Sequence, residues 1–186
     1  FGWNPEKIHQ DLDAVILGMH AQIDNPELLQ AQKLGLKIYS FPEFIFEQSK
    51  DKKRVVIAGS HGKTTTTSMI MHVLNSAGRD FDYLVGAQIE GFDYVVKCSE
   101  SAPIIVIEGD EYLTSPLDLQ SKFLHYSPQL AIITGIAWDH INVFPTYPEY
   151  VETFRKFIQS VEDKIFYYHD DADLKKLALS PHSALM

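Results

Sequence analysis

Short runs of apolar residues alternate along the chain with longer segments that carry helix signals. Runs of strand length lie near residues 13–18, 37–40, 54–58, 82–85, 93–97, 104–107, 130–134 and 164–168. Capping residues, early prolines and closing glycines predict helices over residues 25–35, from 42, and over 64–78, 147–161 and 172–178. This alternation predicts an α/β fold in which helices cover both faces of a mostly parallel sheet.

A charged stretch near residue 50 interrupts this pattern. Residues 48–54 carry four basic side chains and no apolar one. They predict a domain boundary that separates residues 1–50 from residues 51–186, although a solvated turn within one domain is the alternative. The chain begins with Phe1 rather than Met and shows no signal-peptide order there, so we expect a piece of a longer protein.

The composition of the chain limits the kinds of binding partner that we expect. The chain has 16 Lys and Arg against 25 Asp and Glu, a net charge of −9, so nucleic acid and membrane are not expected as partners. The longest apolar runs are of strand length, far short of the roughly 20 residues that cross a bilayer. The single cysteine, Cys98, excludes an internal disulfide framework. These features predict a cytoplasmic protein.

The strongest chemical signal follows the apolar run at residues 54–58. A glycine turn from Gly59 to Gly62 leads directly into Lys63 and Thr64, so backbone N–H groups and a helix N-terminus converge in front of the lysine. This predicts a phosphate site in which Thr64 can also ligate Mg²⁺. The alternative is an ordinary turn with a solvated lysine. Four consecutive threonines at 64–67 argue against it, because β-branched residues are poor helix formers.

Polar residues follow two further strands at the same predicted edge of the sheet. Glu108, Asp110 and Glu111 come after the run at 104–107, and ligands bind at the carboxyl ends of strands in such folds. Glu108 is the acid that we expect to share Mg²⁺ with Thr64, although a solvated acidic turn is the alternative. Asp139 and His140 follow the run at 130–134, where a loop hydrogen bond is the alternative to a metal site.

Together, the segments 59–67, 108–111 and 139–140 resemble the central domain of the Mur ligases, which use ATP to join amino acids or peptides to UDP-N-acetylmuramic acid. The shortened glycine loop is normal in that family. The resemblance implies a central domain like that of P-loop NTPases, preceded by part of a Rossmann-like domain. It assigns to the ATP phosphates Gly59, Ser60, His61, Gly62, Lys63, Thr64 and Thr65.

The resemblance also implies the metal ligands and the reaction. Thr64 and Glu108 would hold one Mg²⁺ and His140 a second, with Lys63, Glu108 and His140 as the catalytic residues. A carboxylate oxygen of UDP-N-acetylmuramic acid attacks the γ-phosphorus of ATP, and an amine then displaces phosphate from the acyl phosphate to leave an amide and ADP. His20, Asn25 and His125 are the candidates for contact with the UDP sugar. A packed or solvated side chain is the alternative for each histidine.

Branches of the family differ in the acceptor, the amino acid or peptide that they join to UDP-N-acetylmuramic acid. The segments 108–112, 121–126 and 139–144 are similar to the branch that adds the tripeptide L-alanyl-γ-D-glutamyl-meso-diaminopimelate in peptidoglycan recycling. The branch that adds L-alanine usually has serine where this chain has Tyr112. Gly109 and Asn142 depart from the peptide-adding pattern, so both acceptors stay open.

The resemblance covers only part of the family's length. It reaches the later part of the first domain and the first two-thirds or so of the central one, so we expect this chain to be inactive alone. A P-loop kinase, a nucleotide switch or a non-catalytic nucleotide-binding module is the alternative from another class.

Overall fold

The computed structural model describes residues 2–178, so the last residues of the predicted central domain lie outside the described residues. Its main sheet has six strands in the order β10-β9-β3-β6-β4-β5. All neighbours are parallel except β4 and β5, which confirms the predicted α/β class. The strands are β3 (Lys53–Ala58), β4 (Asp82–Leu84), β5 (Val96–Lys97), β6 (Ile104–Glu108), β9 (Leu130–Ile133) and β10 (Lys164–Tyr167).

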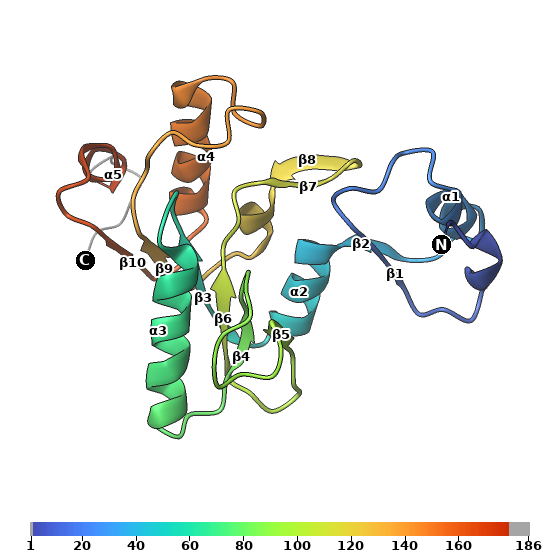
Figure 1. Ribbon diagram of the computed structural model, residues 1–186, viewed down its shortest axis with the longest axis horizontal. Coiled ribbons are helices and arrows are strands. Elements are labelled where there is room, and N and C mark those ends of the chain that lie inside the picture. The colour runs from blue at the N-terminus through green and yellow to red at the C-terminus, as the bar shows by residue number, and fades with distance from the viewer. Residues whose placement is uncertain (1, 179–186) are drawn as a thin grey trace.

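Helices cover both faces of this sheet (Figure 1). The alternation of side chains along β3 shows the two layers, because Val56 and Ala58 belong to one core cluster and Ile57 to the other. The first cluster packs against α4 (Tyr147–Gln159), α5 (Ala172–Ala178) and the 3-10 helix η2 (Lys122–His125). The second packs against α3 (Lys63–Ser76).

A small βαβ unit precedes the sheet and stands apart from it in Figure 1. It consists of the parallel strands β1 (Val15–Leu17) and β2 (Ile38–Ser40), the helix α1 (Pro26–Lys33) and the 3-10 turn η1 (Pro5–Lys7). Asn25 caps α1 by accepting from the N–H groups of Glu27 and Leu28. Ser40 and Glu43 form a capping box at the start of the next helix, α2 (Phe41–Ser49). The predicted starts of both helices are confirmed.

One hairpin was not predicted from the sequence. The strands β7 (Leu113–Ser115) and β8 (Asp118–Ser121) pair antiparallel beside η2. These strands are short, a proline separates them, and neither carries an apolar alternation, so nothing in their pattern distinguishes them from a loop. No helix within residues 2–178 is long and apolar enough to cross a membrane.

The segment around the predicted boundary is anchored to the sheet. Ile45 of α2 lies in the core cluster on the α4 face. Arg54 is only 4% exposed, and its guanidinium donates to the carbonyls of Ser49 (2.9 Å), Lys50 (3.0 Å) and Tyr126 (2.8 Å). Arg54 therefore joins the end of α2 to the turn after η2. The division into residues 1–50 and 51–186 stays a prediction.

Replacing Arg54 with alanine should lower the free energy of unfolding by about 3 kcal/mol, because several buried carbonyls lose their donor at once. Arg54→Lys should recover little of this loss, since an ammonium lacks the planar fork of donors. Urea unfolding followed by circular dichroism measures both. Arg155→Ala is the matched control, because Arg155 is partly exposed and, within the described residues, its ion pair is with Glu152 one helical turn away. Equal stability of the Arg54→Ala and Arg155→Ala proteins would contradict the anchoring role.

Candidate active site at the carboxyl edge of the sheet

The loop between β3 and α3 passes unusually close to the end of β9. A Cβ atom on Gly59 would lie 2.1 Å from Oγ1 and 2.9 Å from the backbone nitrogen of Thr134. Gly59 (φ 127°) and Gly62 (φ 78°) also have backbone angles that side chains disfavour. Glycine at these positions lets the loop fold tightly and turn its N–H groups toward the start of α3.

A polar cavity of about 310 Å³ opens in front of this loop. No acidic residue occupies the first turn of α3, so the positive end of the helix dipole and its free N–H groups face the cavity uncompensated. Such an opening suits an anionic phosphate. The residues that line the cavity are Ser60, His61, Gly62, Lys63, Thr64, Thr65 and Glu108.

Thr64 and Glu108 meet as the sequence predicts. The Thr64 hydroxyl donates to Oε1 of Glu108 at 2.8 Å, and the backbone N–H of Gly86 donates to Oε2 at 2.9 Å. Neighbouring oxygen ligands of an octahedral Mg²⁺ lie about 2.9 Å apart, so this pair fits one ion. Thr67, at the far end of the threonine run, is instead buried with its hydroxyl unpartnered.

Glu111 is the centre of the charged network, and sequence analysis did not select it. Its carboxylate is fully buried and lies 2.9 Å from Nζ of Lys63 and 3.0 Å from Nε2 of His140. Lys63 also donates to the carbonyl of Gly59 at 2.7 Å. The three acids at the end of β6 and just beyond it indicate this region, but their order along the chain does not reveal which carboxylate turns inward.

His140 is held in place from both ring nitrogens. Nε2 faces Glu111, and the hydroxyl of Tyr112 lies 2.8 Å from Nδ1 with the two rings 4.4 Å apart. The backbone of His140 is left-handed (φ 58°), and its carbonyl accepts from the N–H groups of Val143 and Phe144. Through Glu111, the side chain of His140 is linked to Lys63 at the end of the phosphate loop.

Tyr150 ties three loops of the site together. Its hydroxyl lies 2.7 Å from Oγ of Ser60 and 3.4 Å from Oε1 of Glu111, and Ser60 Oγ also accepts from the N–H of Ala137. The side chain is fully buried, and this burial raises the pKa of the Tyr150 phenol. An aromatic residue on an amphipathic helix is usually a core residue, so no sequence pattern singles out Tyr150 as a site residue.

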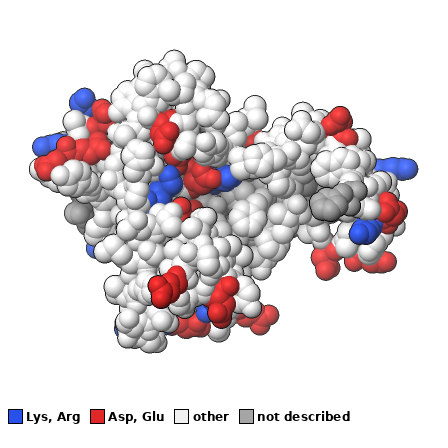
Figure 2. Space-filling model, in the orientation of Figure 1, with Lys and Arg blue, Asp and Glu red and all other residues white. Residues whose placement is uncertain are grey.

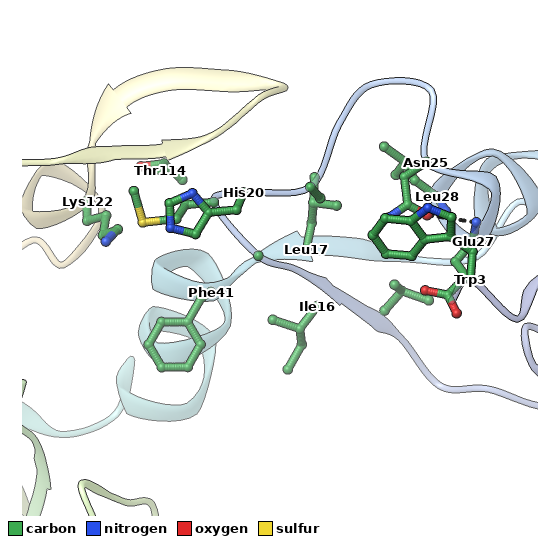
Figure 3. Close-up of a pocket in the computed structure, with 14 residues that line it drawn as sticks. Trp3, Ile16, Leu17, His20, Asn25, Glu27, Leu28, Phe41, Thr114 and Lys122 are labelled. Atoms are coloured by element: carbon green, nitrogen blue, oxygen red, sulfur yellow. Dashed lines mark hydrogen bonds between the residues drawn. The ribbon is translucent and has the colours of Figure 1, made fainter. Parts of the chain in front are cut away.

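A second cavity, of about 650 Å³, lies between β1, α1 and the β7–β8 hairpin. His20 and Asn25 line it, and Figure 3 shows His20 on the side nearer Thr114 and Lys122. The side-chain oxygen of Asn25 is already engaged in capping α1. His125 lines neither this cavity nor the phosphate loop cavity, because its ring faces Asp118.

A third cavity shares lining residues with both of these. It measures about 360 Å³, and Lys63, Glu108 and His140 line it together with Phe41 and Lys122. Phe41 and Lys122 also line the second cavity, so the two cavities are neighbours. Figure 2 shows a compact group of basic and acidic side chains near the middle of this face, whereas most other charges of the face lie toward its edges.

Two solved ligases superpose on most of this chain. The UDP-N-acetylmuramate:L-alanyl-gamma-D-glutamyl-meso-diaminopimelate ligase from Neisseria meningitides superposes with a TM-score of 0.84 and 27% identity over 95% of this chain and 58% of that chain. The UDP-N-acetylmuramate-alanine ligase from Thermotoga maritima, with a TM-score of 0.70 and 24% identity, shares the fold over 90% of this chain and 37% of its own.

Sequence comparison agrees on the family. The UDP-N-acetylmuramate-L-alanine ligase of Carboxydothermus hydrogenoformans is 33% identical over 89% of this chain, and that of Caldicellulosiruptor bescii 36% over 95%. The chain spans 34% and 37% of these two proteins, about a third of their length. The Mur ligase middle domain matches residues 57–184. The chain therefore belongs to the Mur ligase family.

Proposed function

We propose that this chain is the ATP- and magnesium-binding part of a ligase that joins an amino acid or peptide to UDP-N-acetylmuramic acid. The observation that carries the proposal is the placement of Lys63, Glu108 and His140 around one space next to the phosphate loop. A nucleotide-binding module that performs no further chemistry has no need for a buried carboxylate that joins a lysine to a histidine.

Each residue has a role that follows from its position. Lys63 and the N–H groups at the start of α3 bind the ATP phosphates, since they are the donors that face the cavity. Thr64 and Glu108 would hold one Mg²⁺ between their oxygens, and His140 would offer a ligand for a second. Bound ATP and Mg²⁺ supply the phosphoryl group and neutralise the charge that accumulates during its transfer.

The neighbouring cavities suit a large substrate with its reactive end at the phosphates. The UDP portion of UDP-N-acetylmuramic acid would occupy the space lined by His20 and Asn25, and its sugar carboxylate would reach toward Lys63 and His140. There the carboxylate would attack the γ-phosphorus of ATP and expel ADP, which gives an acyl phosphate. The acceptor amine would then attack the acyl carbon and displace phosphate to form the amide. This chemistry belongs to the cytoplasm, where ATP and nucleotide sugars are available.

The acceptor is the finer part of the proposal. Tyr112, which contacts His140, fits the sequence pattern of the tripeptide-adding branch. Similarity to the solved ligase from Neisseria meningitides supports the same acceptor, the tripeptide. The sequence relatives with L-alanine in their names support the alternative. We place the tripeptide first because Tyr112 stands within the site itself.

Lys63→Ala should weaken binding of a fluorescent ATP analogue with Mg²⁺ at least tenfold, because the phosphates lose their nearest cation. The change also leaves Glu111 short of a partner, so Lys63→Ala/Glu111→Gln, which removes both charges, keeps the fold testable. Lys53→Ala is the matched control, since Lys53 is half exposed and 3.9 Å from Asp163. Unchanged nucleotide affinity in both Lys63 proteins would contradict the phosphate site.

Tyr150→Phe should weaken the same binding severalfold by freeing Ser60 and Glu111 from their shared hydroxyl, while lowering the free energy of unfolding by about 1 kcal/mol. Tyr147→Phe removes a phenol from the same helix whose partner is Asp173, away from the loop. Isothermal titration and thermal melting separate the two effects. If both tyrosine variants bind nucleotide equally well, Tyr150 serves only the core.

The acceptor is tested by phosphate release from a full-length ligase that contains this chain, supplied with ATP, Mg²⁺ and UDP-N-acetylmuramic acid. We expect turnover with the diaminopimelate tripeptide and none with L-alanine. Turnover with L-alanine alone would instead assign the chain to that branch. Phosphate release without any UDP-N-acetylmuramic acid would favour a kinase or nucleotide switch. The 186-residue chain alone should release no phosphate under these conditions.

A further inference from the structure

Three metal-ligating side chains converge where α2 meets the β7–β8 hairpin, away from the phosphate loop. They are Glu43 in the first turn of α2, Asp118 at the start of β8 and His125 at the end of η2. One ligand atom from each lies within 4.8 Å of the other two. Asp118 and His125 are seven residues apart, whereas Glu43 lies 75 residues before Asp118, so the fold brings α2 to the other two ligands.

The imidazole of His125 carries an unsatisfied nitrogen that faces this cluster. Its Nε2 is buried and has no hydrogen-bond partner among residues 2–178. Oδ2 of Asp118 lies 2.9 Å away but outside hydrogen-bond geometry, and the side chain of His125 is 14% exposed. A buried polar atom without a partner costs free energy. A cation that accepts the nitrogen lone pair would remove that cost.

Both carboxylates keep an oxygen for such a cation. Glu43 uses Oε2 to accept from the backbone and hydroxyl of Ser40, and Asp118 uses Oδ1 to accept from the N–H of Gln120. Oε1 of Glu43 and Oδ2 of Asp118 accept no hydrogen bond from the described residues. The helix cap and the hairpin turn therefore orient the two carboxylates, as supporting hydrogen bonds do for metal ligands.

We propose that Glu43, Asp118 and His125 bind a divalent transition-metal ion such as Zn²⁺. One imidazole and two carboxylates form a donor set that suits zinc, with a water molecule completing the coordination, whereas Mg²⁺ and Ca²⁺ prefer oxygen alone. Two carboxylates and a neutral imidazole carry a charge of −2, which the ion balances.

The ion would join two walls of the 650 Å³ cavity. Phe41 begins the helix that carries Glu43, and Thr114 lies on the strand paired with the one that begins at Asp118. Both Phe41 and Thr114 line that cavity. A cation between α2 and the hairpin would therefore fix the spacing of these walls. The alternative is an ion pair between protonated His125 and Asp118 that holds no metal.

Metal-stripped chain titrated with Zn²⁺ by calorimetry tests this site. We expect one Zn²⁺ bound per chain through these residues, a rise in melting temperature, and a Co²⁺ absorption spectrum typical of low coordination number. His125→Gln, Asp118→Asn and Glu43→Gln should each weaken Zn²⁺ binding at least tenfold. Glu43→Gln is informative because glutamine still serves in a capping box, so the helix keeps its cap while the ligand loses its charge.

Two further variants separate this site from other histidines. His169→Gln removes an exposed histidine 3.2 Å from Asp170 that has no third ligand in the described part of the chain, and it should leave Zn²⁺ binding unchanged. His140→Gln should also leave the His125-dependent binding intact, so failure of the phosphate site and failure of this proposal are distinguishable. Absence of Zn²⁺ binding by the His140→Gln chain, or Zn²⁺ binding by that chain that survives the addition of His125→Gln, would overturn the proposal.

Discussion

A carboxylate without access to water must be neutralised, and this requirement organises the edge of the sheet. Glu111 is fully buried, and the groups that neutralise it come from the start of α3 and from the loop after β9, with a hydroxyl from α4. Lys63 at the start of α3 and His140 in the loop after β9 also line a cavity. The need to neutralise buried Glu111 therefore fixes the positions of Lys63 and His140. Glu111 itself is not exposed to a ligand in this structure.

Much of this architecture follows from local sequence. The alternation of apolar runs with capped helices predicts the sheet and its helices, and the carboxyl ends of parallel strands explain why Lys63, Glu108 and His140 lie close together. The inward turn of Glu111 and the reach of Tyr150 depend on contacts between segments distant in sequence. The β7–β8 hairpin has no apolar alternation, so its pairing depends on the surrounding fold.

Polar groups at the two edges of the sheet lie in different surroundings. At its carboxyl edge, charged groups stay close to open cavities, where a ligand can exchange for their present partners. Near its other edge, the guanidinium of Arg54 and the carboxylate of Asp82 are buried and bonded to fixed groups of the chain. Lys52 completes the Asp82 cluster as a buried ion pair. Buried contacts therefore hold the amino edge of the sheet in place. At the carboxyl edge, a substrate can displace the present partners of the charged groups.

The anchoring of Arg54 also bears on how the chain acquires its structure. Two of its acceptors, Ser49 and Lys50, are close neighbours in sequence, but Tyr126 is 72 residues away. A folding intermediate that has buried β3 before η2 arrives would hold a guanidinium with incomplete hydrogen bonding, which is unstable. Docking of α2 and closure of this long loop are thus expected to occur in one cooperative step.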